Sequence, residues 1–97
     1  MTVSILVEGI LKDEFKGVLQ DVCAEAFLVT RSFEGCQNIS LTLNVENDKN
    51  FVLTEIWDSE EHYKKYFNFR VKDGTINMMK EMCSNGPEIR IFQINDA

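Results

Sequence analysis

The chain changes from a strand pattern to a helix pattern within Phe51-Val-Leu-Thr-Glu55-Ile-Trp57-Asp58-Ser59-Glu60-Glu61-His62-Tyr63. The first half is rich in β-branched and aromatic residues, which predicts a strand that ends at Trp57. Asp58 or Ser59 can then accept a hydrogen bond from the free amides of a helix start, and the two glutamates that follow suit the positive end of the helix dipole. The junction brings a carboxylate, an indole and an imidazole together, so we expect any chemistry to begin here.

Upstream of this junction the sequence predicts one strand and one helix. Residues 3–10 carry aliphatic side chains on both alternating sets of positions, which is typical of a central strand that is buried on both faces. From Asp13 the apolar spacing changes to three and four residues, so we expect an amphipathic helix that stops before Gly35. Its expected apolar face consists of Phe15, Val18, Leu19, Val22, Ala26 and Val29.

The middle of the chain predicts a hairpin, and the last third predicts a helix and a final strand. Residues 39–45 alternate strictly between apolar and polar, Asn47–Asn50 supply turn residues, and the strand Phe51–Trp57 follows. The second helix begins at the junction and is expected to break or kink near Asp73-Gly74, because glycine is unfavourable inside a helix. Ser84–Pro87 should end that helix, and Ile89–Ile94 should form the fourth strand.

The resulting order, β-α-β-β-α-β, predicts an α+β fold of the ferredoxin-like, split βαβ type with a four-stranded antiparallel sheet. Right-handed crossovers place both helices on one face of that sheet. Apolar residues nevertheless occur on both faces of three strands, and monomers rarely expose a large apolar sheet. We therefore expect a second copy of the chain to cover the open face in a homodimer.

Size, charge and cysteine usage exclude several classes of protein. The 97 residues are expected to form one domain, 1–97, and no stretch approaches the roughly 18 apolar residues of a membrane helix. A net charge of −6 without clustered basic residues argues against nucleic acid and anionic membrane as partners. The three cysteines lie far apart without a C-x-x-C pair, and there is one histidine, so no metal site is expected. The N-terminus lacks the basic region of a signal peptide, which predicts a cytoplasmic location.

Several motifs together resemble those of a known family. They are Gly35-Cys36, then Glu55-x-Trp57-x-Ser59-x-Glu61-His62-Tyr63-x-x-Tyr66, then Phe69-Arg70, Gly74 and Pro87-Glu-Ile-Arg-Ile-Phe92. The pattern resembles the antibiotic biosynthesis monooxygenase domain family over nearly the whole chain. The Glu-x-Trp-x-Ser block, followed by Tyr-x-x-aromatic-Arg, is similar to the quinol monooxygenase-like branch, in which the aromatic residue before the arginine is commonly Trp and here is Phe69.

The resemblance implies a dimeric α+β barrel in which each protomer has a pocket between its sheet and its helices. It also implies a class of activities, since characterised members oxidise quinol-like or polyketide aromatics with dioxygen and without metal or flavin. Some relatives degrade haem through an iron-ligating histidine further along the second helix, where this chain has Tyr66, Phe67 and Asn68. Haem degradation is therefore the less favoured implication.

Three residues of the junction have two interpretations each. Glu55 shares a strand face with Trp57, so its carboxylate is either paired with Arg70 or acts as a general base with a raised pKa. Trp57 either stacks on a planar substrate or packs in the core. His62, near a helix start that favours its neutral form, either lies in solvent or acts as the base.

Further pocket candidates follow on the second helix and on the hairpin. Tyr63, Tyr66 and Arg70 are spaced to lie on one stripe of the helix, where they either line a pocket or pack against the sheet. Asn38 is a candidate polar group of the pocket, with an exposed surface position as the alternative. The leading hypothesis is a cofactor-independent monooxygenase with His62 or Glu55 as base, Trp57, Tyr63 and Tyr66 placing a small aromatic substrate and Arg70 stabilising an oxyanion. A non-catalytic binding protein or structural homodimer is the alternative.

Overall fold

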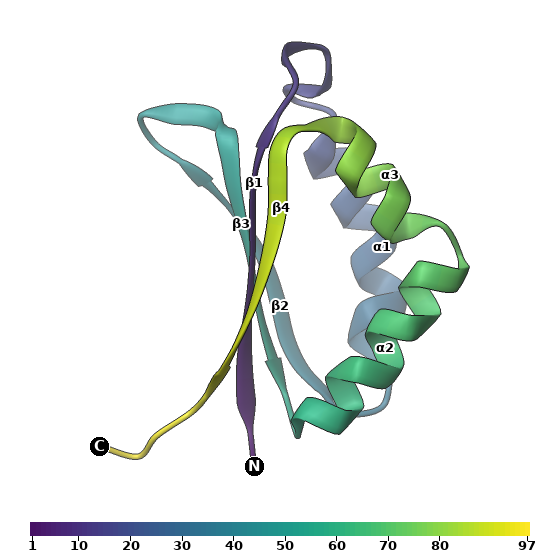
Figure 1. The fold of residues 1–97 in the computed structure, drawn as a ribbon, viewed down its shortest axis with the longest axis vertical. Coiled ribbons are helices and arrows are strands. Elements are labelled where there is room, and N and C mark those ends of the chain that lie inside the picture. The colour runs from purple at the N-terminus through teal and green to yellow at the C-terminus, as the bar shows by residue number, and fades with distance from the viewer.

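A computed structural model describes residues 1–97 as one sheet with all helices on the same side (Figure 1). The elements, in chain order, are β1 (Val3–Leu11), a 3-10 turn (Asp13–Phe15), α1 (Leu19–Ser32), β2 (Cys36–Asn44), β3 (Asn47–Trp57), α2 (Glu60–Lys72), α3 (Thr75–Met82) and β4 (Cys83–Gln93). The predicted α+β class, the split βαβ order and the antiparallel sheet are confirmed. No helix is long and apolar enough to cross a membrane.

The sheet has the order β2-β3-β1-β4, and every neighbouring pair is antiparallel. In the two central strands the odd-numbered residues face the helices and are buried, from Val3 to Leu11 and from Phe51 to Trp57. They pack against the buried residues of α1, α2 and α3 to form a single core. Because side chains alternate along a strand, Glu55 and Trp57 are both directed into this core.

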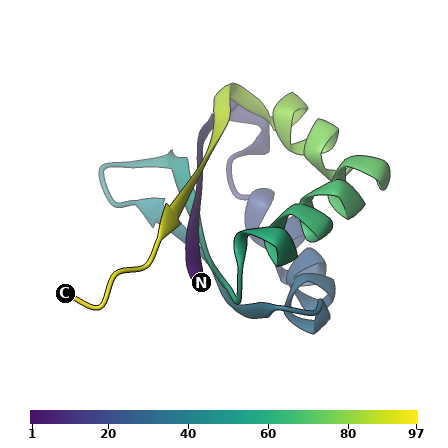
Figure 2. The same ribbon diagram turned by 60° about the horizontal axis from the view of Figure 1, so that its bottom comes forward.

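The other face of the sheet has no helix over it, as Figures 1 and 2 show. Its central positions are the even-numbered residues of β1 and β3, which are only partly buried. Apolar and polar side chains mix on this open face, and its apolar members are Leu6, Ile10, Val52, Ile56 and Phe92. The prediction that both faces carry apolar residues is confirmed.

The first helix starts later than predicted, and the residues it buries agree with the predicted apolar face only in part. A 3-10 turn and Gly17, whose φ is +83°, separate β1 from α1, which begins at Leu19 instead of Asp13. The buried positions of α1 are Leu19, Cys23, Phe27 and Thr30. Val18 and Val29, which were expected on the buried face, are 40% and 43% exposed. Apolar residues lie on both flanks of this helix, so their spacing alone does not decide which flank is buried. Packing against the sheet buries one of them.

Two connections also differ from the prediction. The hairpin turn lies at Val45-Glu46, because the side chain of Asn44 accepts a hydrogen bond from the Glu46 amide (2.9 Å), so Asn47–Asn50 belong to β3. The last strand begins at Cys83, so Ser84–Pro87 belong to β4 instead of a loop. The predicted break in the second helix is confirmed, since Gly74 separates α2 from α3 with a φ of +86°.

Gly35 connects α1 to β2 at a position where a side chain does not fit. Its φ is +92°, and a Cβ atom would lie 2.5 Å from the Cβ of His62. Gly17 has a similar φ of +83° but open space around it, so it serves as the matched control. We expect Gly17→Ala to lower the free energy of unfolding by about 1–2 kcal/mol from backbone strain, and Gly35→Ala by about 2–5 kcal/mol because the clash adds to that strain. Urea unfolding of both variants measures the difference, and equal losses would show that α2 moves aside without cost.

Candidate functional site

A cavity of about 60 Å³ lies between the helix-covered face of the sheet and the three helices. Its wall is mostly apolar and includes Met78, Met79 and Met82 of α3. The polar side chains in the wall are few and come from four elements: Thr30 of α1, Glu55 of β3, Tyr63, Tyr66 and Arg70 of α2 and Thr75 of α3. The pocket implied by the resemblance is therefore present in this chain.

Glu55 is the carboxylate of this cavity. Its residue is only 3% exposed, and its Oε1 accepts a hydrogen bond from the indole Nε1–H of Trp57 (2.9 Å). The other oxygen, Oε2, has no hydrogen-bond partner in the protein, and Glu55 is one of the residues that line the cavity. Burial raises the pKa of Glu55 to about 7, while the Trp57 hydrogen bond and the charge of Arg70 oppose the shift.

Trp57 is fully buried and does not line the cavity. Its ring lies against Tyr66, with centroids 4.9 Å apart, and is edge-on to Tyr63 and Phe33 at 6.0 and 6.3 Å. Of the two interpretations of Trp57, core packing describes this structure, because aromatic side chains of the protein surround the indole. Its contribution to the site is the hydrogen bond to Glu55.

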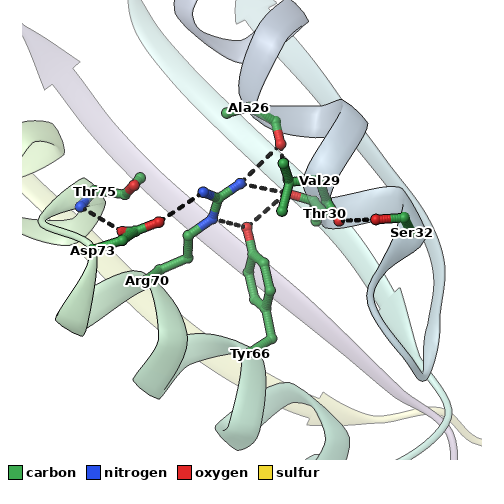
Figure 3. A network of polar contacts seen from close by, with 8 residues as sticks. All are labelled: Ala26, Val29, Thr30, Ser32, Tyr66, Arg70, Asp73 and Thr75. Carbon is green, nitrogen blue, oxygen red and sulfur yellow. Dashed lines mark hydrogen bonds and ion pairs between the residues drawn. The ribbon is translucent and has the colours of Figure 1, made fainter.

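Arg70 lies at the centre of a network that joins α2 to α1 (Figure 3). Nε donates to the Tyr66 hydroxyl (2.9 Å), one terminal nitrogen donates to the Asp73 carboxylate (3.0 Å), and the other donates to Ala26 O (2.8 Å) and Thr30 Oγ1 (3.2 Å). The expected ion pair between Arg70 and Glu55 is not formed, because Asp73 is the carboxylate that Arg70 meets. Four of the five guanidinium N–H groups are thus used within the protein.

The direction of each hydrogen bond in this network can be assigned. Since Arg70 donates to the Tyr66 hydroxyl, that hydroxyl can give its proton to Thr30 Oγ1, which lies 2.7 Å away. Thr30 in turn donates to Ala26 O (3.2 Å). The Tyr66 hydroxyl is therefore occupied on both its donor and its acceptor side, which makes it a structural group more than a proton donor for a ligand.

The remaining predicted site residues divide between the cavity and the surface. Tyr63 is buried and lines the cavity, and burial raises the pKa of its hydroxyl. His62 does not line the cavity; its Nδ1 and its amide both meet Ser59 Oγ, at 2.7 and 3.1 Å, in the N-terminal cap of α2. Asn38 is exposed on the open face, opposite Ile56, which is the surface position given as its alternative, and it does not line this cavity.

Two parts of the cavity wall were not among the predicted site residues. Thr30 is fully buried and holds the centre of the Arg70 network, but a threonine within an amphipathic helix carries no apolar signal of burial. Thr75 of α3 is also part of the wall, a position that depends on how α3 folds back after Gly74. The spacing of Thr30 after Phe27 was the one available indication, because residues three apart share a helix face.

The raised pKa of Glu55 predicts a characteristic dependence of stability on pH. Between the unfolded value of 4.5 and the folded value of about 7, the folded state holds a proton that the unfolded state releases. The free energy of unfolding therefore falls as pH rises through this window, by about 3 kcal/mol in total from this group. Glu55→Gln removes the titration, so the difference in unfolding free energy between variant and wild type should grow in favour of the variant from pH 4.5 to 8. A difference that stays constant would show that Glu55 is ionised in the fold at both pH values.

Comparison with known sequences gives one family. Residues 10–70 match the model of the family described as antibiotic biosynthesis monooxygenase, and no curated protein matches the chain. The matched segment runs from the end of β1 through β2 and β3 to Arg70, and so includes Glu55 and Trp57.

Solved structures show the same fold at low sequence identity. A conserved protein from Methanosarcina mazei Go1 is 17% identical, with a TM-score of 0.88 over 98% of this chain and 94% of the other. A protein from Deinococcus radiodurans named as a putative antibiotic biosynthesis monooxygenase is 17% identical, with a TM-score of 0.82 over 100% and 95% of the two chains. SnoaB, a cofactor-independent oxygenase from Streptomyces nogalater, is 10% identical, with a TM-score of 0.84 over 99% and 95%.

Proposed function

Because the chain belongs to the antibiotic biosynthesis monooxygenase family, we propose that it is a monooxygenase that oxidises a small quinol-like or phenolic aromatic with dioxygen and without a cofactor. The observation that carries the proposal is the environment of the Glu55 carboxyl group. One of its oxygens accepts a hydrogen bond from Trp57 and the other has no protein partner, the residue lines a mostly apolar cavity, and its pKa of about 7 suits a general base at neutral pH. SnoaB, with the same fold, is named as a cofactor-independent oxygenase, which supports the same class.

The proposed reaction uses the ionised form of Glu55. The carboxylate takes a proton from the substrate, and the resulting phenolate or enolate gives one electron to dioxygen. The substrate radical and superoxide then join through a new C–O bond, and the peroxide loses its outer oxygen as water, with Glu55 returning its proton. In sum, a CH2 group beside an aryl ketone plus O2 gives C=O plus H2O, or a hydroquinone plus O2 gives a hydroxyquinone plus H2O. The substrate supplies all four electrons that dioxygen accepts, so no external reductant is required.

The rest of the cavity has supporting roles in this proposal. The positive charge of Arg70, a residue that is 6% exposed, acts in a dry environment and favours an anion formed next to it. One of its N–H groups remains free of protein partners and can meet a substrate oxygen. Tyr63 and Tyr66 line the cavity with their aromatic side chains. His62 is not needed as a base in this arrangement, because it lies outside the cavity wall.

The size of the cavity limits the substrate. At about 60 Å³ it is smaller than the roughly 150 Å³ of a buried cavity that accommodates benzene. Even a one-ring substrate therefore requires some wall residues to move. Met78, Met79 and Met82 are suited to this because the methionine side chain is unbranched and flexible.

Oxygen uptake with a panel of hydroquinones and anthrones tests the proposed activity. We expect one dioxygen to be consumed for each hydroxyquinone formed from a hydroquinone, or for each anthraquinone formed from an anthrone, with water as the second product. Hydrogen peroxide in place of water would indicate simple autoxidation, and uptake no faster than without protein would remove the enzyme hypothesis and leave a non-catalytic binding protein. Added superoxide dismutase and catalase serve as controls for chemistry outside the cavity.

We also propose that two copies pair through the open face of the sheet. Leu6, Ile10, Val52, Ile56 and Phe92 give that face a partly exposed apolar centre, which a second copy would bury. Light scattering at micromolar concentration should give twice the chain mass of 11.2 kDa. A single-chain mass under those conditions would contradict the homodimer.

A further inference from the structure

The hydrogen bond between Trp57 and Glu55 joins a fully buried residue to the one carboxylate in the cavity wall. The indole N–H can donate but not accept, and it meets Oε1 at 2.9 Å. Both residues lie on the same face of β3, two positions apart, so the strand itself fixes their relative placement. Trp57 does not line the cavity, so its effect on a bound molecule must pass through Glu55.

The indole is held in place more firmly than a hydrogen-bond donor on a flexible side chain. Phe33, Tyr63 and Tyr66 surround its ring, with centroid distances of 6.3, 6.0 and 4.9 Å. None of its residue surface is exposed to solvent. A donor fixed in this way selects one orientation of the Glu55 carboxyl group, in which Oε1 points to the indole and Oε2 to the cavity.

We propose that Trp57 is the positioning residue of Glu55: its N–H fixes one carboxyl oxygen, directs the other into the cavity and stabilises the ionised form that accepts a proton. The catalytic part of this inference rests on the function proposed above. The positioning of the carboxyl group does not, because it concerns the protein without substrate. The proposal gives the Glu-x-Trp spacing of β3 a role different from substrate stacking.

Other groups around Glu55 have to be considered in any pH experiment. From α2 these are Arg70, Tyr63 and Tyr66, and from β2 the thiol of Cys36, each of which interacts electrostatically with the carboxylate. The residues paired with Glu55 in the neighbouring strands, Ile5 and Ile39, are apolar. Burial raises the pKa of Tyr63 and of Cys36, so these two groups stay neutral across the range in which Glu55 ionises.

The single tryptophan of the chain makes the proposal directly observable. NMR of wild-type protein shows one indole N–H resonance, and we expect its position to change between pH 5 and 9 with a midpoint at about 7, the pKa of Glu55. The change should disappear in Glu55→Gln and persist in His62→Gln, which removes the only imidazole. An indole resonance that does not move in wild type, or that still moves in Glu55→Gln, would overturn the proposal.

Trp57→Phe keeps an aromatic ring but removes the N–H donor together with part of the ring volume. We expect the titration midpoint of the Glu55 carboxyl, followed by carbon NMR, to rise by about one to two pKa units, the effect of a lost hydrogen bond to a charged group. An unchanged midpoint in folded Trp57→Phe would contradict the proposal. If this variant does not fold, the pH dependence of the indole resonance in wild-type protein is sufficient to test the proposal.

Kinetics with an active substrate test the catalytic part. Trp57→Phe should lower kcat at pH 7 by about 5- to 50-fold, because a smaller fraction of Glu55 is ionised, and the lost activity should return at high pH with little change in KM. A loss that is equal at every pH would indicate structural damage instead and would sink the catalytic role. If the wild-type protein oxidises no substrate, the proposed function fails, while the indole titration still tests the positioning of Glu55.

Discussion

Glu55→Gln is expected to lower kcat for oxygen uptake by about 100- to 10,000-fold at pH 8, the range found when a positioned general base is removed. Glutamine has nearly the same shape and can still accept the Trp57 N–H through its carbonyl oxygen, so the core around β3 should stay intact. What it lacks is the basic oxygen that faces the cavity. The measurement is the initial rate of dioxygen consumption with the best substrate of the hydroquinone and anthrone panel.

The matched control is Glu25→Gln on α1. Glu25 is exposed, forms no ion pair or side-chain hydrogen bond, and is not part of the cavity wall, so the same chemical change there should leave kcat within about twofold of wild type. Unfolding of Glu55→Gln should also be measured, because this variant is expected to gain stability at pH 8. A stable Glu55→Gln protein with wild-type kcat would remove Glu55 as the base and direct attention to the substrate's own acidity.

The pH profile adds a second check on the same group. Since the ionised form is the active one, kcat/KM should rise with pH and level off above about 7, the pKa to which burial raises Glu55. Stability moves in the opposite direction through the same window, because the folded state loses the proton it prefers to keep. Activity and stability thus trade against each other through one buried carboxyl group.

The strands and the second helix could be predicted from the sequence because their signals are local. The alternation of β1 and β3 follows from side-chain directions along a strand, and the Ser59 cap and the Gly74 break are properties of single positions. The start of α1 could not be predicted in the same way, because the spacing from Asp13 suits a helix while the positive φ of Gly17 depends on how the chain turns back over the sheet. The burial of Thr30 could not be predicted either, because this residue is polar and its position depends on tertiary packing.

The site could be predicted only in part, because local spacing assigns residues to a face but does not assign their bonding partners. That Glu55 and Trp57 share a face follows from their spacing, and that α2 brings Tyr63, Tyr66 and Arg70 to the cavity follows from the helical repeat. Which of these groups bond to one another depends on tertiary packing. Arg70 meets Asp73 and α1 instead of Glu55, and Trp57 donates to Glu55 instead of facing a ligand. Pairwise partners of this kind lie outside what periodicity can assign.

Arg70→Met is expected to lower the free energy of unfolding by about 3–5 kcal/mol, the cost of breaking a buried charge network by removing one partner. Methionine keeps an aliphatic stem of similar length but lacks the guanidinium, whose Cζ lies 5.4 Å and 5.5 Å from the ring centroids of Tyr66 and Phe69. Its removal takes away the N–H groups that Arg70 donates to Ala26 O and to the Tyr66 hydroxyl, and it leaves Asp73 without its ion pair. Urea unfolding followed by circular dichroism measures the change.

Arg31→Met is the matched control for this substitution. Arg31 also lies over an aromatic ring, that of Phe27 at 5.3 Å, and donates to the backbone oxygen of Ile39 (3.0 Å), but it is exposed. Arg31→Met should lower the free energy of unfolding by only about 1 kcal/mol, because water replaces the lost donor. If Arg70→Met lowers the free energy of unfolding no more than Arg31→Met does, the Arg70 network does not hold α2 to α1. The main role of the guanidinium would then be to interact with a bound anion. A loss of unfolding free energy several times larger would mean that the position of Tyr63 and Tyr66 in the cavity wall depends on Arg70. Part of any kinetic effect of Arg70 variants would then come from a displaced α2.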